Sequence, residues 1–393
     1  MTTPFPTPAA APAASDALLG VYGRVGPLFV AGEGSELIGE DGTRYLDFVA
    51  GIAVNALGYN SPVFRDAVLR ALESGLVHVS NLYRTEPGER LAAELTRNFA
   101  GHVFFCNSGA EANEGAFKFA RKWSRKPGIV AFSGSFHGRL FASLAATDRP
   151  DYRRPFEPLL PNVDIVPFGD RETARRAITA ERTGAVIIEP VQGEGGVRPV
   201  PAEFLEFLRG LCDSAGAALI FDEVQCGLGR TGSLFAAEQT GVVPDIYTLA
   251  KPLGGGLPMG AILVSDRIAA TLAPGDHATT FGGGPFVATV ALEVLKTIAD
   301  PDFLTDVKTK GALLGARLGE IAARSSRVRE ARGRGLMWGL ELNEAAAPAV
   351  AAARERHLLV LTAGPNVIRI VPPLTISRDD LERGATILEE VLA

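Results

Sequence analysis

The segment Asp245-Ile-Tyr-Thr-Leu-Ala-Lys-Pro-Leu-Gly-Gly-Gly-Leu-Pro-Met-Gly-Ala261 places Lys251 directly after an apolar run and before a glycine-dense turn. A second apolar run, residues 219–221, ends in an acid, Asp222. Continuous apolar runs predict strands that are buried on both faces, and hence a mostly parallel sheet covered by helices. In such α/β folds, ligands bind at the carboxyl ends of the strands. The two segments therefore predict an α/β fold with Lys251 and Asp222 in one site.

A lysine and an acid at the ends of two buried strands suit pyridoxal 5′-phosphate. The lysine amine forms a Schiff base with this cofactor, and the acid holds the protonated pyridine nitrogen, so that the ring accepts electrons. Each residue alone has an ordinary explanation. A lysine after an apolar run usually lies in solvent, and Asp222 alone fits a helix N-cap or a metal ligand. The cofactor prediction therefore depends on the other motifs of the chain.

Composition limits the classes of function. The chain has 393 residues, of which 47% are hydrophobic and 21% are charged, so it can bury a sizeable core in two domains or in one large domain with an appendage. Its net charge of −6 argues against a nucleic-acid partner, because phosphate binding requires clustered lysine and arginine. No apolar stretch approaches the roughly 20 residues that cross a bilayer, so no membrane partner is expected.

The cysteines and the N-terminal segment indicate the compartment. Cys106, Cys212 and Cys226 have neither a disulfide pattern nor metal-ligand spacing. This fits a reducing, cytoplasmic location and predicts no metal site. Residues 1–15 are rich in Ala, Pro and Thr and contain no basic residue before an apolar core. We therefore expect a disordered tail and not a secretory signal.

Short apolar runs alternate with helical patterns along the middle of the chain. Strands are expected at residues 102–106, 129–132, 163–166, 185–188, 217–221, 246–249 and 260–264, and helices at 111–124 and 202–214.

The flanks differ from this middle region. Residues 28–54 are typical of short strands with a turn at 40–43, and residues 289–393 contain two or three long helical patterns with strands at 335–342, 358–361 and 367–371. The expected division is a tail (1–15), the N-terminal part of a small domain (16–60), a large cofactor-binding domain (61–288) and the C-terminal part of the small domain (289–393).

Three loops carry groups that suit the cofactor. Ser108-Gly-Ala110 precedes a helix, so its backbone N–H groups and the helix dipole favour an anion, although an ordinary strand-to-helix turn has the same pattern. Phe132-Ser-Gly-Ser-Phe-His-Gly-Arg139 offers an aromatic ring, Phe136, for stacking, and an arginine. Its His137 is more often a hydrogen-bonded structural residue than a catalyst. Ala278-Thr-Thr-Phe-Gly-Gly-Gly284 adds hydroxyls and backbone donors.

Together these segments resemble the class III pyridoxal-phosphate aminotransferases, most closely their acetylornithine branch, from residue 28 to residue 392. The most specific motifs, besides the Lys251 segment, are Phe104-Phe-Cys-Asn-Ser-Gly-Ala-Glu-Ala-Asn113, Ile188-Glu-Pro-Val-Gln-Gly-Glu-Gly195 and Asp222-Glu-Val-Gln-Cys-Gly-Leu-Gly-Arg-Thr-Gly232. The resemblance implies a fold type I α/β transferase: a mostly parallel central sheet flanked by helices, with a smaller α+β domain formed by both termini.

The resemblance also implies roles by position. Lys251 and Asp222 are the catalytic pair. Cofactor contacts are implied for Ser108, Gly109, Ala110, Phe136, Glu189, Glu223, Val224, Gln225 and, from the neighbouring subunit, Thr280. Substrate contacts are implied for Arg139, Glu194, Thr279 and Arg369. The implied assembly is a homodimer with shared active sites.

Two carboxylate-binding arginines are useful because the two substrates bind in different orientations. Guanidinium groups bind carboxylates through paired hydrogen bonds. Glu194 resembles a residue that masks Arg369 and so switches between the orientations. The alternative is that Glu194 is a surface acid and Arg369 belongs to a structural ion pair. Two positions depart from the family pattern: Pro252 follows the lysine, and Gly284 replaces a common asparagine.

The expected function is transfer of the terminal amino group of N2-acetylornithine to 2-oxoglutarate in arginine biosynthesis, in a ping-pong reaction through the Lys251 Schiff base. The products are N-acetylglutamate semialdehyde and glutamate. Alternative amino donors are ornithine, 4-aminobutyrate or a carrier-linked or N-acylated lysine intermediate of lysine synthesis. A second alternative is a non-catalytic relative that only binds the cofactor, which the intact Lys251 and Asp222 disfavour. A nucleotide-dependent dehydrogenase is also disfavoured, because no Gly-x-Gly-x-x-Gly follows an early strand.

Overall fold

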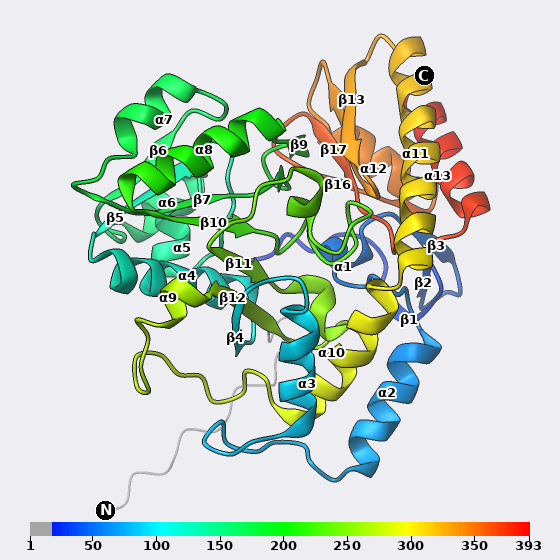
Figure 1. The fold of residues 1–393 in the computed structure, drawn as a ribbon. Coiled ribbons are helices and arrows are strands. Elements are labelled where there is room, and N and C mark those ends of the chain that lie inside the picture. The colour runs from blue at the N-terminus through cyan, green and yellow to red at the C-terminus, as the bar shows by residue number, and fades with distance from the viewer. Residues whose placement is uncertain (1–17) are drawn as a thin grey trace, which may run out of the picture.

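A seven-stranded sheet with strand order β4-β12-β11-β10-β7-β5-β6 forms the centre of the molecule (Figure 1). The computed structural model describes residues 18–393, so the expected tail over residues 1–15 lies outside the described residues. The strands are β4 (Gly101–Cys106), β5 (Gly128–Phe132), β6 (Val163–Val166), β7 (Thr183–Ile188), β10 (Ala218–Asp222), β11 (Ile246–Leu249) and β12 (Gly260–Ser265). β12 runs antiparallel to β11 and β4, and the other pairings are parallel. The prediction of a mostly parallel sheet is confirmed.

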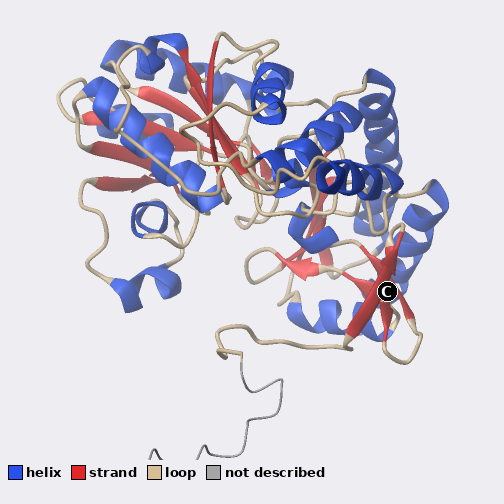
Figure 2. Ribbon diagram, turned by 90° about the horizontal axis from the view of Figure 1, so that it is seen from below, coloured by secondary structure: helices blue, strands red, loops and turns tan. Residues whose placement is uncertain are grey.

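Helices cover both faces of this sheet, as Figure 2 shows. Alternate side chains of β7 point to opposite faces: Val186 belongs to one buried cluster and Ile187 to the other. Helix α8 (Ala202–Ala215) packs in the first cluster, and helix α4 (Gly109–Ser124) packs in the second. The strands are therefore continuous apolar runs because both of their faces are buried.

Two smaller sheets bring the chain ends together. The first has the order β1-β2-β3-β15 and the second β13-β14-β17-β16. Their strands are β1 (Phe29–Glu33), β2 (Glu36–Gly39), β3 (Arg44–Asp47), β13 (Val328–Arg334), β14 (Met337–Leu342), β15 (Leu358–Leu359), β16 (Leu361–Thr362) and β17 (Val367–Ile370). Figure 1 shows the N-terminal strands in blue beside the orange and red C-terminal elements. Their helices are α11 (Pro301–Arg324), α12 (Ala347–Glu355) and α13 (Arg378–Leu392).

Helix α10 (Pro285–Ile298) connects the two regions because it buries two faces. Ala288 and Leu295 belong to a core cluster of the large sheet, whereas Val290 and Val294 belong to the core of the smaller sheets. Helix α2 (Pro62–Glu73) packs on the same second core through Ala67. The exact domain bounds given above remain a prediction.

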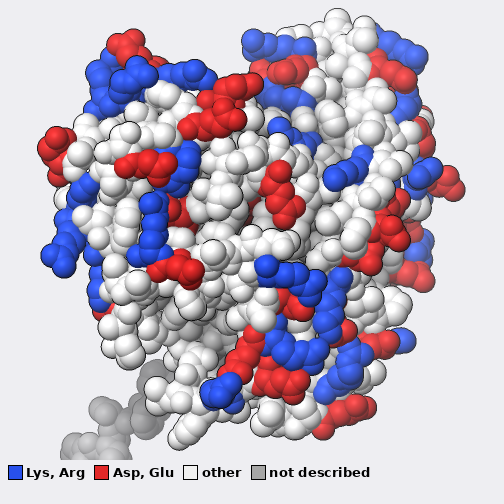
Figure 3. Space-filling view, in the orientation of Figure 1, with Lys and Arg blue, Asp and Glu red and all other residues white. Residues whose placement is uncertain are grey.

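The remaining elements are short or lie at the edges. They are α1 (Ala50–Ala53), α3 (Glu86–Leu95), α5 (Phe141–Ala145), α6 (Pro150–Arg153), α7 (Arg171–Ala177), α9 (Asp266–Ala269), the β8 (Val191–Gln192) and β9 (Arg198–Pro199) hairpin, and 3-10 turns at Arg154–Phe156, Ala236–Gln239 and Lys251–Gly254. No helix among residues 18–393 is long and apolar enough to cross a bilayer. Acidic and basic side chains are interspersed over the face in Figure 3.

Two expectations about the flanks need correction. The expected strand region 28–54 ends in the irregular helical turn α1, where Ala50, Ile52 and Ala53 adopt positive φ values of 49°, 64° and 65°. Polar groups stabilise this turn, because Asp47 accepts hydrogen bonds from the backbone of Val49 and Ala50. The strand expected at 335–342 begins only at Met337, and its partner β13 was not predicted.

Candidate active site

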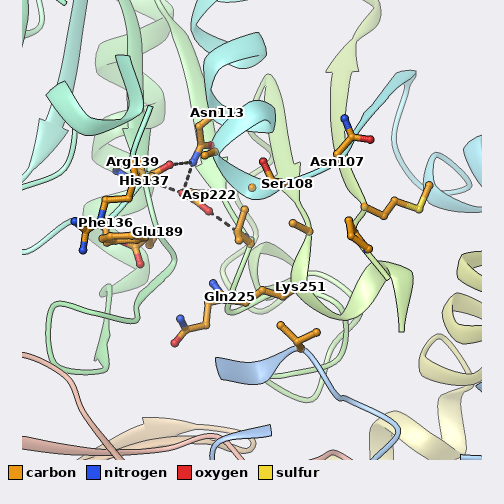
Figure 4. Close-up of a pocket in the computed structure, with 18 of the residues that line it drawn as sticks. Asn107, Ser108, Asn113, Phe136, His137, Arg139, Glu189, Asp222, Gln225 and Lys251 are labelled. Atoms are coloured by element: carbon orange, nitrogen blue, oxygen red, sulfur yellow. Dashed lines mark hydrogen bonds and ion pairs between the residues drawn. The ribbon is translucent and has the colours of Figure 1, made fainter. Parts of the chain in front are cut away.

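The carboxyl edge of the large sheet opens into a cavity of about 460 Å³ (Figure 4). Asp222 is the last residue of β10, and Lys251 follows the neighbouring parallel strand β11 by two residues. Most of the predicted site residues line this cavity: Ser108, Gly109, Ala110, Phe136, Arg139, Glu189, Glu194, Asp222, Val224, Gln225 and Lys251. The fold therefore brings together residues that come from five separate parts of the sequence.

The Asp222 carboxylate is buried and held by three groups. Oδ2 lies 2.7 Å from His137 Nδ1 and accepts a hydrogen bond of 2.8 Å from Asn113 Nδ2. Oδ1 accepts a hydrogen bond of 3.0 Å from the backbone N–H of Val224. These contacts fix the orientation of the carboxylate toward the cavity, as Figure 4 shows. They leave it available to a cationic nitrogen in the cavity.

Sequence reasoning missed Asn113 as a site residue and assigned His137 no particular partner. Asn113 is 1% exposed, although it lies on a helix face otherwise buried by apolar residues. A polar residue on an apolar helix face was the available signal, because buried amides need hydrogen-bond partners. His137 is the hydrogen-bonded residue that was expected, and its partner is Asp222.

Lys251 extends into the cavity from a strained backbone. Its φ is 31°, in the left-handed region that non-glycine residues seldom adopt, and strain of this kind clusters at functional sites. Pro252 follows within the 3-10 turn and fixes the backbone there. Burial lowers the pKa of the Lys251 amine, and the nearby Asp222 carboxylate opposes this shift. A lowered pKa increases the fraction of neutral amine, which is the form that acts as nucleophile and base.

An anion-binding position lies at the N-terminus of α4. Ser108 caps this helix by accepting a hydrogen bond of 3.2 Å from Glu111 N–H. Within residues 18–393, the N–H groups of Gly109 and Ala110 have no protein hydrogen-bond partner. A Cβ atom on Gly109 would lie 2.7 Å from Val224 Cγ1, so close packing requires glycine here. Two free N–H groups at a helix N-terminus fit a phosphate group.

Glu189 connects two loops of the cavity. Its carboxylate accepts hydrogen bonds of 3.0 Å from Phe136 N–H and 2.9 Å from Gly193 N–H. Burial raises the pKa of Glu189 to about 7, and the neighbouring His137 opposes the shift. Glu189 therefore holds both the loop that carries the Phe136 ring and the loop that carries Glu194.

The two predicted carboxylate-binding arginines differ in their surroundings. Arg139 is exposed at the cavity and forms neither an ion pair nor a hydrogen bond with the described residues. Arg369 is 2% exposed and lies outside the residues that line the cavity. Its guanidinium pairs with Glu194 Oε1 at 2.5 Å and also donates to Gln225 Oε1 at 3.3 Å. The structure thus contains the predicted Glu194–Arg369 pair, and its gating role remains a prediction.

Besides Arg369, three predicted residues do not line the cavity of the same chain. The Glu223 carboxylate accepts hydrogen bonds of 2.6 and 2.8 Å from the N–H groups of Ala236 and Ala237, and burial raises its pKa to about 8. The Thr279 hydroxyl accepts a hydrogen bond of 3.2 Å from Asn107 Nδ2. Thr280 is exposed. Their roles at the site remain predictions.

Comparison with known proteins places this geometry in a family. Residues 24–392 match the family model described as aminotransferase class-III. The chain is similar to the mitochondrial acetylornithine aminotransferase of Alnus glutinosa, with 49% identity over 97% of this chain and 86% of the relative. It is 48% identical to the acetylornithine aminotransferase of Gloeobacter violaceus, over 95% of this chain and 94% of the relative.

Solved structures show the same similarity. The N-acetylornithine aminotransferase of Stenotrophomonas maltophilia superposes with a TM-score of 0.80 and 37% identity, over 93% of this chain and 95% of that one. The ornithine aminotransferase of Toxoplasma gondii superposes with a TM-score of 0.91 and 27% identity, over 96% and 93% of the two chains.

Proposed function

This chain belongs to the class III aminotransferases, and from that membership we propose that it transfers the terminal amino group of N2-acetylornithine to 2-oxoglutarate. The products are N-acetylglutamate semialdehyde and glutamate, as in arginine biosynthesis. The relatives from Alnus glutinosa and Gloeobacter violaceus, both described as acetylornithine aminotransferases, support this donor. One observation carries the proposal: the cavity is lined by one open arginine, Arg139, and by Glu194, which pairs with a second, buried arginine, Arg369.

The cofactor is pyridoxal 5′-phosphate, and the cavity fits it. Gly109 and Ala110 would hold the phosphate with their free N–H groups. Asp222 would hold the ring nitrogen, Phe136 and Val224 would pack against the ring, and Gln225 would bind a ring hydroxyl. When bound, the cofactor supplies an electron sink for the electron pair of a carbon–hydrogen bond beside the transferred amine.

Side chains of the cavity carry out the proton transfer and hold the reacting groups in position. Lys251 moves the proton, because its amine faces the cavity and its lowered pKa favours the neutral base. Asp222 stays in place for its cationic partner, because Asn113, His137 and the Val224 N–H hold it. Positioning and a prearranged carboxylate are the contributions that the protein makes to such a reaction.

Substrate choice follows from the arginine pair. Acetylornithine carries one carboxylate and one free amine, so Arg139 alone can hold it while Glu194 continues to mask Arg369. 2-Oxoglutarate carries two carboxylates, one of them beside the reacting carbon. Glu194 must therefore release Arg369 when the oxo acid binds. The masked state is the one in the structure, and it favours a donor with a single carboxylate at its far end.

Substitution of the two arginines tests this function. Arg139→Ala should weaken both half-reactions, whereas Arg369→Ala should weaken the 2-oxoglutarate half much more than the acetylornithine half. Losing one partner of a buried charged contact costs about 2–5 kcal/mol, which corresponds to roughly 30- to 5,000-fold. Single-turnover measurements of each half-reaction decide the matter, with the exposed Arg176→Ala as a control of the same residue type. Equal losses in both halves for Arg369→Ala would count against the gate.

Single-turnover measurements of the donor half-reaction, made on the wild-type protein, separate the possible donors. Acetylornithine should react faster than ornithine, 4-aminobutyrate or acetyl-lysine at equal concentration. Ornithine and 4-aminobutyrate are the alternatives without an acyl group, and acetyl-lysine represents the N-acylated and carrier-linked intermediates of lysine synthesis. A faster reaction with one of these would replace the donor and keep the reaction type. No reaction with any donor would favour a cofactor-binding relative without catalysis.

We further propose a cytoplasmic homodimer with shared active sites. Thr280 is exposed and lies outside the cavity of its own chain, as a residue that serves the partner's site would. Asn81 Nδ2 donates to the carbonyl groups of Thr279 and Gly282 and so links this loop to the segment that carries Leu82. Leu82 is 90% exposed and Phe281 is 68% exposed. Apolar side chains exposed together on one surface indicate a protein interface.

Mixing inactive subunits tests the shared site. Lys251→Ala and Thr280→Ala subunits are each defective, but a mixed dimer should hold one site with both defects and one site with neither. Activity after subunit exchange should therefore rise above that of both parents, toward about a quarter of the wild-type value if the subunits mix at random in equal amounts. Exchange demonstrated by mass spectrometry without recovered activity would exclude a contribution of Thr280 in trans.

A further inference from the structure

The Arg139 guanidinium has no acidic partner among the described residues, but an aromatic ring supports it. Arg139 Cζ lies 3.4 Å from the centroid of the Tyr152 ring, close enough for face-to-face stacking. It lies 5.8 Å from the centroid of the Phe136 ring. Stacking fixes the plane of a guanidinium while leaving its N–H groups free along the edge. Arg139 is therefore oriented for a carboxylate by a contact that does not compete with one.

Tyr152 itself is held close to the cofactor loop. It belongs to the short helix α6, and its N–H donates to the Arg149 carbonyl at 2.9 Å. Directly before this turn, Asp148 N–H donates to the Ser135 carbonyl at 3.0 Å, and Asp148 Oδ2 accepts from Gly134 N–H at 2.8 Å. The turn that carries Tyr152 is thus fastened to the loop that carries Arg139.

Arg149, the first residue of the same turn, contacts the Glu194–Arg369 pair, whose opening would act as a gate for the second carboxylate. The Arg149 guanidinium donates a hydrogen bond to the backbone carbonyl of Glu194. Glu194 lies between Gly193 and Gly195, so the neighbouring residues provide no side chains to anchor it. A Cβ atom on Gly195 would lie 2.5 Å from the Gly134 carbonyl oxygen, which excludes larger residues there. The position of Glu194 therefore depends on backbone contacts such as the one from Arg149.

We propose that residues 149–152 form a specificity-determining turn in which Tyr152 positions Arg139 and Arg149 positions Glu194. One turn would then set both the open carboxylate site and the strength with which Glu194 masks Arg369. Both are positioning residues, because neither is required to touch the reacting atoms. This proposal deepens the proposed function and rests on its assignment of Arg139 and Arg369 to substrate carboxylates.

Binding of unreactive ligands to the cofactor-loaded protein tests the turn without catalysis. Glutarate has two carboxylates and no oxo group, and N-acetylnorvaline has the acetylated end of the donor and no terminal amine. Tyr152→Leu should weaken both ligands by about 3- to 30-fold, because the stacking contact is lost. Tyr152→Phe retains the ring and should stay within about 2-fold of the wild type. Isothermal titration calorimetry measures both affinities.

Arg149→Met should act differently. Without its hydrogen bond, Glu194 holds Arg369 less well, so glutarate should bind about 3- to 10-fold more tightly. N-Acetylnorvaline, which needs only Arg139, should bind within about 2-fold of the wild type. Arg154 is exposed and directly follows α6, so Arg154→Gln serves as a control and should change neither affinity. Melting temperature and cofactor absorbance confirm that each variant is folded and loaded.

Opposite results overturn the proposal. Unchanged affinities in Tyr152→Leu would show that stacking does not position Arg139, and Tyr152→Met repeats the test if the leucine variant is unstable. Unchanged or weaker glutarate binding in Arg149→Met would show that this contact does not hold the gate. If the wild-type protein binds glutarate but does not accept acetylornithine, the proposed donor is wrong. The glutarate affinities still decide the role of the turn.

Discussion

Lys251→Ala is expected to reduce turnover by at least about 10⁴-fold, because positioned proton transfer alone contributes about 10²- to 10⁴-fold and covalent attachment of the cofactor is lost as well. The side chain faces the cavity, and its amine has the lowered pKa that a base requires. Lys251→Arg should be equally inactive, because a guanidinium keeps the charge but does not release its proton. The pair of variants separates loss of chemistry from loss of a charge.

Chemical trapping provides the matching measurement on the wild-type protein. Borohydride treatment of the cofactor-loaded protein, followed by peptide mapping, should place the cofactor label on Lys251. Lys118→Ala serves as the control, because Lys118 lies outside the cavity and contacts His277. A label on another lysine, or turnover retained in Lys251→Ala, would contradict the assignment.

The large sheet could be predicted because the apolar pattern of each central strand lies within a few consecutive residues. Each central strand is a short apolar run buried on both faces, and such a run is visible in the sequence without knowledge of its neighbours. β13 was missed for the opposite reason. Its sequence Val328-Arg-Glu-Ala-Arg-Gly-Arg334 carries four charges, because it lies at the edge of its sheet with much of its surface accessible. Edge strands often carry such charges.

The site could be predicted in part for a similar reason. Lys251 and Asp222 end adjacent strands, so the sheet alone places them together. The groups that orient them come from distant parts of the chain: Asn113 is 109 residues from Asp222, and His137 is 85 residues from it. Contacts of this kind depend on how helices and loops pack onto the sheet. The positions of Arg149 and Tyr152 have no sequence signal of the same strength.

Asp222→Asn is expected to retain the cofactor and lose about 10²- to 10³-fold of turnover, the effect of removing one prearranged electrostatic group. Retention follows because the phosphate would still be held by the N–H groups of Gly109 and Ala110. An amide has nearly the shape of the carboxylate, so it fits among Asn113, His137 and the Val224 N–H, although its NH2 group cannot accept one of the hydrogen bonds that the carboxylate accepts. The amide lacks the negative charge that keeps the ring nitrogen protonated, so the ring would accept electrons less readily.

Two measurements make this expectation specific. Cofactor content by absorbance should equal that of the wild type, while single-turnover rates fall in both half-reactions. Asp245→Asn is the matched control, because Asp245 is also a buried acid but pairs with Arg209 and Arg267 away from the cavity. That control should lower the melting temperature and leave the rate per folded molecule nearly unchanged. Near-normal rates in Asp222→Asn would show that this carboxylate is not what keeps the ring nitrogen protonated. Loss of the cofactor would show that the carboxylate acts mainly as an anchor.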